Sequence, residues 1–204
     1  KMEPPTIYMP GHIVAGVEAM LKSFSRLDRG RLPCHLIAVE AGDEIELSRE
    51  LVMTVHRTTH SVPSVGFLVW ERRLKLKPEY HGLAGHEIRD LRLAGAQVSA
   101  ETRMPLLAYT GDTSPGGLDN NPDFLRAQVL ITEMTFVAPK HRREKIHKHG
   151  HMHLDDFVAR QDAFQNELII AAHFSVRYNG RQVMREIEKK IPGLLAGRLR
   201  PWIE

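Results

Sequence analysis

Residues 154–173 read LDDFVARQDAFQNELIIAAH: a helical pattern leads into a short, continuous apolar run, and a histidine follows that run. The same order occurs just upstream, where a helical pattern at residues 122–127 precedes the apolar run at residues 129–131. Short continuous apolar runs are typical of buried strands. Strands that alternate with helices in this way predict an α/β fold.

Outward from this stretch, the spacing of apolar residues predicts further strands and helices. The strands are expected at residues 6–9, 36–39, 45–47, 51–55, 66–70 and 106–109, with an edge strand near Leu199, and the helices at residues 12–27, 85–93 and 181–191. Residues 71–100 are basic, and we expect them to be loop-like around the helix at residues 85–93. A chain of this length is expected to form a single domain, residues 1–204.

The composition argues against several classes of protein. The 204 residues carry a formal net charge of +3, which permits a polyanionic partner without requiring one. A single cysteine, Cys34, rules out an internal disulfide. The chain has no apolar run near the roughly 20 residues that span a bilayer, and residues 1–10 lack the apolar region of a signal peptide. We therefore expect neither a membrane partner nor secretion.

Polar side chains follow three of the predicted strands at the point where each strand ends: His60, Asp112 and His173. Residues at such positions point into the crevice where α/β folds bind ligands. Two imidazoles and one carboxylate are a common ligand set for Zn²⁺ or Mn²⁺. Each of the three, taken singly, is more often structural, so the residues alone indicate an α/β hydrolase-like domain and leave the metal open.

Acid–base candidates accompany these residues. Glu133 follows the apolar run at residues 129–131, and His151 lies in a dense group of histidines. That group consists of His141, His147, His149, His151 and His153. So many imidazoles in one short stretch raise metal binding or acid–base chemistry to a working hypothesis, and a structural Glu133–His151 pair is the alternative.

Five blocks resemble, in order and spacing, the motifs of the short-form tRNase Z (ribonuclease Z) family of the metallo-β-lactamase superfamily. They are HSVPSVGF (60–67), YTGDT (109–113), ITEMTF (131–136), HGHMH (149–153) and AHFSVRY (172–178). The flanking segments 4–10 and 73–99 are similar too, so the resemblance covers nearly the whole chain. It implies a metallo-β-lactamase-type αββα layered sandwich with a short basic arm-like insertion near residues 71–100.

One family motif, HxHxDH, appears nowhere in the sequence. We expect it to lie just before Lys1, so that the chain is the C-terminal two-thirds of an N-terminally incomplete domain. The resemblance implies two Zn²⁺ ions in a complete member, and we expect weak or absent zinc binding in this chain alone. By the same resemblance Asp112 bridges the two ions, His60 completes one and His173 the other.

The family cleaves 3′ trailers from precursor tRNA by phosphodiester hydrolysis. The resemblance implies that Glu133 orients His151, that His151 protonates the leaving 3′ oxygen, and that Asp112 belongs to the catalytic centre. It also implies precursor tRNA as partner, a homodimer, and the cytoplasm as compartment, with an organelle the alternative in a eukaryote. The cations Arg72, Arg73, Lys75 and Lys77 are expected to contact tRNA phosphates, unless they only solvate a strand end.

Two further functions stay open on the sequence. The same fold can hydrolyse a small cyclic phosphodiester or another ester. The chain can also be a non-catalytic fragment that binds RNA or a partner, which the missing ligands favour. Metal content and cleavage of a precursor tRNA separate all three.

Overall fold

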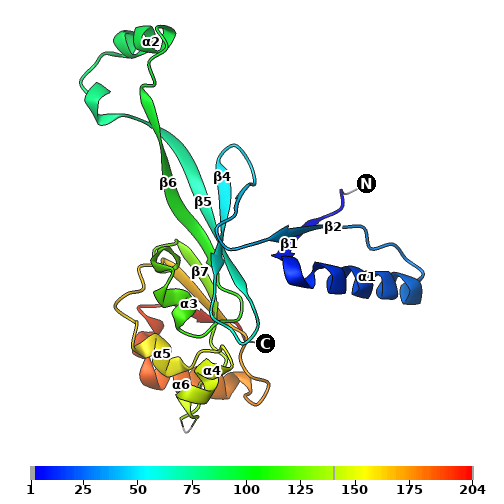
Figure 1. Cartoon of the computed structure of the whole chain (residues 1–204). Helices are drawn as coiled ribbons and strands as arrows, with labels where there is room; N and C mark the ends of the chain where they lie inside the picture. The colour runs from blue at the N-terminus through cyan, green and yellow to red at the C-terminus, as the bar shows by residue number, and fades with distance from the viewer. Residues whose placement is uncertain (1–2, 140, 204) are drawn as a thin grey trace.

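In the computed structural model, which describes residues 3–139 and 141–203, the main feature is a seven-stranded sheet in the order β3-β4-β5-β6-β7-β8-β9 (Figure 1). Its strands are β3 (Glu44–Glu46), β4 (Leu51–Arg57), β5 (Val65–Leu76), β6 (Ser99–Tyr109), β7 (Val129–Glu133), β8 (Leu168–Ala172) and β9 (Leu199–Pro201). Strands β3 to β6 pair antiparallel, and β6 to β9 pair parallel. The predicted α/β architecture is confirmed, and β9 is the predicted edge strand.

This topology decides which strand ends meet. Strands β6, β7 and β8 are parallel neighbours, so their carboxyl ends share one edge of the sheet. Strand β4 is antiparallel to β5, which is antiparallel to β6, so β4 also runs toward that edge. The loops after β4, β6, β7 and β8 therefore leave the sheet from one side.

Short helices gather at one end of this sheet and pack against strands β5 to β9 (Figure 1). They are α3 (Gly116–Asp119), α4 (Arg143–Lys148), α5 (Leu154–Val158) and α6 (Gly180–Lys190), with the 3₁₀ turns η3 (Pro122–Leu125) and η4 (Pro192–Leu194). The core lies between: Leu68, Leu130 and Ile169 of the sheet pack with Phe157 of α5 and Ile187 of α6, all at most 1% exposed. The helices predicted at 122–127 and 154–164 are shorter than expected, because a 3₁₀ turn forms the first and the second ends at Val158.

The N-terminal residues form a separate small unit (Figure 1). Strand β1 (Thr6–Pro10), 3₁₀ turn η1 (Gly11–Ile13), helix α1 (Val14–Asp28) and strand β2 (His35–Val39) make a two-stranded parallel sheet with its crossover helix. None of the residues of α1, all of which are described, is buried. Within residues 3–139 and 141–203, no helix combines the length and the apolar character needed to cross a membrane.

The expectation of a loop-like segment at residues 71–100 is wrong at both ends of the segment, whereas residues 77–98 are irregular around the predicted helix. Strand β5 continues to Leu76 and β6 begins at Ser99, so the two form a long projecting hairpin (Figure 1). Its tip carries η2 (Pro78–Tyr80) and α2 (Gly85–Leu93), and the latter has the predicted bounds. Both faces of the outer hairpin are solvated, so the sequence shows no alternation of apolar and polar residues there.

A proline inside β6 is a second reason why the hairpin was not predicted from the sequence. Pro105 pairs with Trp70 at the register shift between Val69 and Trp70. A proline cannot donate to the ladder and is tolerated at such an irregularity, whereas in the sequence it looks like the end of a strand.

Two leucines of β5 test where the stability comes from. We expect Leu68→Ala to lower the free energy of unfolding by about 2–5 kcal/mol, because Leu68 is fully buried. Leu74→Ala on the same strand is the matched control: this side chain is 70% exposed, so a change within about 0.5 kcal/mol is expected. Urea denaturation measures both. Equal losses would place the stabilising core elsewhere.

Candidate metal centre

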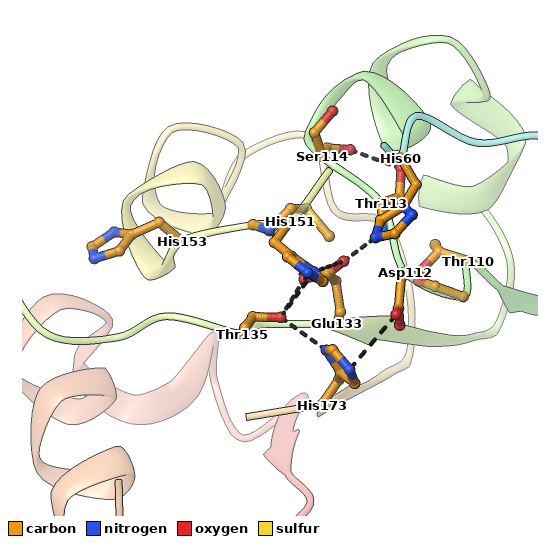
Figure 2. A network of polar contacts seen from close by, with 12 residues as sticks. His60, Thr110, Asp112, Thr113, Ser114, Glu133, Thr135, His151, His153 and His173 are labelled. Carbon is orange, nitrogen blue, oxygen red and sulfur yellow. Dashed lines mark hydrogen bonds and ion pairs between the residues drawn. The ribbon is translucent and has the colours of Figure 1, made fainter. Parts of the chain in front are cut away.

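The five residues singled out in the sequence come together at the shared edge of the sheet (Figure 2). Glu133 is the last residue of β7, His173 follows β8, Asp112 follows β6, and His60 lies in the loop after β4. His151 comes from the segment between α4 and α5. The sheet topology thus brings these side chains together from positions far apart in the chain.

Glu133 is a buried carboxylate, 2% exposed, with four donors around it. Its oxygens accept hydrogen bonds from the backbone N–H of Thr113, the backbone N–H of Met152 at 3.1 Å, and the hydroxyl of Thr135. The ring Nδ1 of His151 lies 3.2 Å from both oxygens. A buried charge needs such compensation, so Glu133 fixes three neighbouring segments in one arrangement.

The contact with Glu133 decides how the ring of His151 is oriented. An ionised carboxylate only accepts hydrogen bonds, so Nδ1 of His151 is the donor. Its Nε2 is therefore the nitrogen left for a ligand or substrate. One ligand atom each from His60, Asp112 and His151 lie within 4.8 Å of one another, and the His60 and His151 ring centroids are 5.1 Å apart.

Thr135 orients His173 by a similar argument. The single hydroxyl hydrogen of Thr135 is donated to Glu133, so its oxygen accepts from Nδ1 of His173 at 2.9 Å. In the neutral ring Nε2 of His173 then carries a lone pair, and it lies 3.6 Å from Oδ2 of Asp112. His173 has a φ of +60°, a left-handed conformation that is costly for a residue with a side chain.

The donor set fits a divalent cation. Two lone-pair donors that face each other repel unless a proton or a cation lies between them. With metal–ligand bonds of about 2.1 Å, two tetrahedral zinc ligands lie roughly 3.4 Å apart, close to the 3.6 Å between His173 and Asp112. Imidazole nitrogens and carboxylate oxygens are also the donors that Zn²⁺ and similar ions prefer.

The loops that carry His60 and Asp112 are tied to each other. The hydroxyl oxygen of Thr113 accepts from the backbone N–H of Thr59 at 2.9 Å, and the backbone N–H of Ser114 donates to the carbonyl of Thr59 at 2.7 Å. Thr113 and Thr135, which position these loops and rings, were not predicted from the sequence. Both lie inside the quoted blocks YTGDT and ITEMTF, but a threonine gives no signal of its own there.

Gly150 is a third residue of the site that was not predicted from the sequence. Its φ is +83°, and a Cβ at this position would lie 2.3 Å from Cα of His60. Such a distance is impossible, so the close approach of the His151 segment to the His60 loop requires glycine.

The four basic residues of the predicted RNA contact lie on β5 and just after it, at the hairpin. Arg72 makes a bidentate ion pair with Glu46 at 2.7 and 3.0 Å, and that hydrogen bond raises the pKa of Arg72. Arg73 pairs with Glu71. In the described part of the chain, Lys75 and Lys77 have no ion-pair partner. The two arginines are thus held in the hairpin, whereas the two lysines are available to a ligand.

Comparison with known proteins places this geometry in context. No model of a known protein family matches the chain. The chain is 33% identical to tRNase Z TRZ1 of Arabidopsis thaliana over 98% of its own length and 71% of the relative's. It is 31% identical to the chloroplastic tRNase Z TRZ2 of the same plant, over 100% of its own length and 58% of the relative's.

Two solved structures share the fold. One is the metallo-β-lactamase fold protein YhfI of Bacillus subtilis, with a TM-score of 0.53 at 15% identity over 97% of this chain and 62% of the other. The other is the short form of human tRNase Z, with a TM-score of 0.52 at 19% identity over 87% of this chain and 64% of the other. The predicted metallo-β-lactamase fold is confirmed, and the chain spans under two thirds of either structure.

Gly150→Ala tests whether the packing of the two loops holds His60 in place. Gly95→Ala is the matched control, because Gly95 has a φ of +85° but no described atom within 4 Å of the position that a Cβ would take. The control should lose about 1–2 kcal/mol of unfolding free energy from the left-handed backbone alone. Gly150→Ala should lose more and should shift the NMR signals of the His60 ring. Equal losses with an unchanged His60 signal would contradict this account.

Proposed function

Because this chain belongs to the tRNase Z family, we propose that it takes part in tRNA processing as a metal-dependent endoribonuclease that removes 3′ trailers from precursor tRNA. The observation that carries the proposal is the Glu133–His151 pair beside the ligand atoms of His60, Asp112 and His173. A fixed acid–base pair next to a metal-ligand set is what phosphodiester hydrolysis requires. The family membership supports RNA as the substrate.

A divalent metal belongs to this proposal, and zinc is the ion we propose. His60, Asp112 and His173 are the residues that would hold it. A bound metal supplies Lewis-acid stabilisation of the charge that develops on the attacked phosphate. The motif HxHxDH is not among the 204 residues, so these three residues make up part of a ligand set, and assays need added zinc.

The residues of this chain perform the proton transfer. Glu133 accepts from Nδ1 of His151 and holds the ring, which leaves Nε2 as the proton-bearing atom toward the substrate. His151 donates that proton to the leaving 3′ oxygen. Glu133 also stabilises the imidazolium before transfer, because the two groups lie 3.2 Å apart. Thr135 keeps the pair and His173 in one hydrogen-bonded network.

The proposed partners follow from the surface. Lys75 and Lys77 of the hairpin contact tRNA phosphates, supported by the unpaired state of both within the described residues. A homodimer is supported by the apolar side chains exposed on α1, of which Phe24 is 53% and Leu27 82% exposed. The compartment is the cytoplasm, with an organelle as the eukaryotic alternative, since one relative is named chloroplastic.

Trailer cleavage with added zinc, by this chain and by a version completed with an HxHxDH segment, and the dependence of that cleavage on His151, test the function. We expect His151→Ala to lower kcat about 10²–10⁴-fold, the usual contribution of general acid–base catalysis, with little change in tRNA affinity. His35→Ala, an exposed histidine on β2, is the control and should leave both unchanged. Single-turnover cleavage and filter binding measure the two quantities.

Three results would count against this proposal. Equal loss of binding and cleavage in His151→Ala would mark the histidine as structural. Cleavage of a cyclic dinucleotide in place of precursor tRNA would favour the small-phosphodiester alternative. Tight RNA binding without any cleavage, with zinc present, would favour the non-catalytic alternative.

The hairpin cations give a separate prediction. Replacing both Lys75 and Lys77 by glutamine should weaken tRNA binding and reduce the slope of log K against log salt by about 0.7–0.9 for each phosphate that the protein no longer neutralises. Arg72→Gln is the comparison, because Arg72 is committed to Glu46. It should leave the slope unchanged. A slope that falls with Arg72→Gln but not with the lysine variant would reverse the assignment.

A further inference from the structure

A pocket of about 650 Å³ opens beside the metal centre. Its wall includes His60 and His151, the aromatic rings of Phe136 and His141, and the basic residues Arg142, Lys145 and Arg177. His60 and His151 therefore belong to its wall and to the centre at once. Its size falls within the range of small-molecule and cofactor sites.

Lysine and arginine side chains give the pocket a positive charge. Arg142 lies before α4, Lys145 on α4 and Arg177 after β8, and all three are exposed. No aspartate or glutamate is among the described residues that line it, and the three cations have no ion-pair partner in the described part of the chain. Three cations without counter-ions around one hollow attract an anion.

Two neighbouring basic residues of the same segment are arranged differently. Arg143 lies 3.9 Å from Asp156, and His147 lies 2.9 Å from the same carboxylate. Asp156 is 3% exposed, so it anchors this side of the helix to the protein. Helix α4 thus has one side that Asp156 anchors to the protein and another side that is open to a ligand.

The wall of the pocket also has an aromatic part. Phe136 and His141 lie with ring centroids 5.0 Å apart, and Nε2 of His141 is 2.7 Å from the hydroxyl of Tyr178. Burial, His153 and Arg177 lower the pKa of His141, which favours the neutral form of the ring. Neutral aromatic faces stack on nucleobases, whereas cations bind phosphates.

We propose that this pocket is the subsite for the nucleotide that carries the leaving 3′ oxygen. The inference rests on the proposed function, because the proton of His151 goes to that oxygen and His151 lines the pocket. The base lies against Phe136 and His141, and the 5′ phosphate of the nucleotide contacts Arg142 and Lys145. Arg142 and Lys145 are positioning residues: they place the nucleotide and do not touch the reacting atoms.

The test uses binding, so it does not depend on turnover. The probe is a fluorescent RNA that ends with a 3′ hydroxyl at the cleavage position, with either a normal phosphate or a neutral methylphosphonate 5′ of its last nucleotide. Wild-type chain should bind the methylphosphonate RNA about tenfold to a hundredfold more weakly, the loss expected for hydrogen bonds to a charged group. Fluorescence anisotropy measures both affinities.

Arg142→Gln/Lys145→Gln is the test variant. It should bind the normal RNA about as weakly as wild type binds the methylphosphonate RNA, and it should distinguish the two RNAs less than threefold, because both changes remove the same interaction. Lys148→Gln/Lys189→Gln is the matched control, with the same charge change at exposed sites outside the pocket. It should keep the full discrimination of wild type.

Discrimination that persists in Arg142→Gln/Lys145→Gln, or that is lost equally in the control, overturns the subsite. Failure of the subsite and failure of the function are distinguishable. A chain that loses discrimination only in the test variant but never cleaves a trailer supports the subsite and contradicts the function. A chain that cleaves trailers while the test variant discriminates like wild type contradicts the subsite alone.

Discussion

The buried carboxylate of Glu133 is the constraint on which the site depends. It accepts from the backbone N–H groups of Thr113 and Met152, from the hydroxyl of Thr135 and from the ring of His151. These donors come from the loops after β6 and β7 and from the segment before α5. A carboxylate without its donors would be an uncompensated buried charge, which costs several kcal/mol. The requirement to satisfy one side chain therefore fixes three loops at once.

The buried packing contacts are concentrated in one part of the molecule. The helices α3, α5 and α6 pack against strands β5 to β9 of the seven-stranded sheet, and the site lies at the edge of this layer. The hairpin β5–β6 and the unit β1–α1–β2 project from it with little buried surface of their own (Figure 1). Buried contacts are thus concentrated beneath the site where the proposed proton transfer would occur, and the projecting parts expose most of their surface.

The residues around the candidate metal centre would separate two tasks of the proposed reaction. The side that Thr135 and Glu133 organise sets the direction of the His151 and His173 nitrogens. The side formed by Arg142, Lys145 and Arg177 carries positive charge that no described carboxylate in the pocket neutralises. Proton placement needs short, fixed hydrogen bonds, whereas phosphate attraction works over longer distances and tolerates mobile side chains.

The element types of the core and the strand-end positions of His60, Asp112 and His173 follow from the sequence. The pairing of Glu133 with His151 follows from the resemblance of its motifs. Apolar periodicity and ordered motifs carry this information locally. The sequence did not reveal the hairpin of residues 65–109, because a strand with two solvated faces has no alternation and Pro105 looks like a breaker.

The pairing of the polar groups, in contrast, depends on tertiary packing. Arg72 looks as free as Lys75 in the sequence, but strand β3 brings Glu46 to it. The need for glycine at position 150 likewise arises from the approach of the His60 loop. Partner choice and close approach depend on residues distant in the chain, so tertiary packing determines them and local sequence does not.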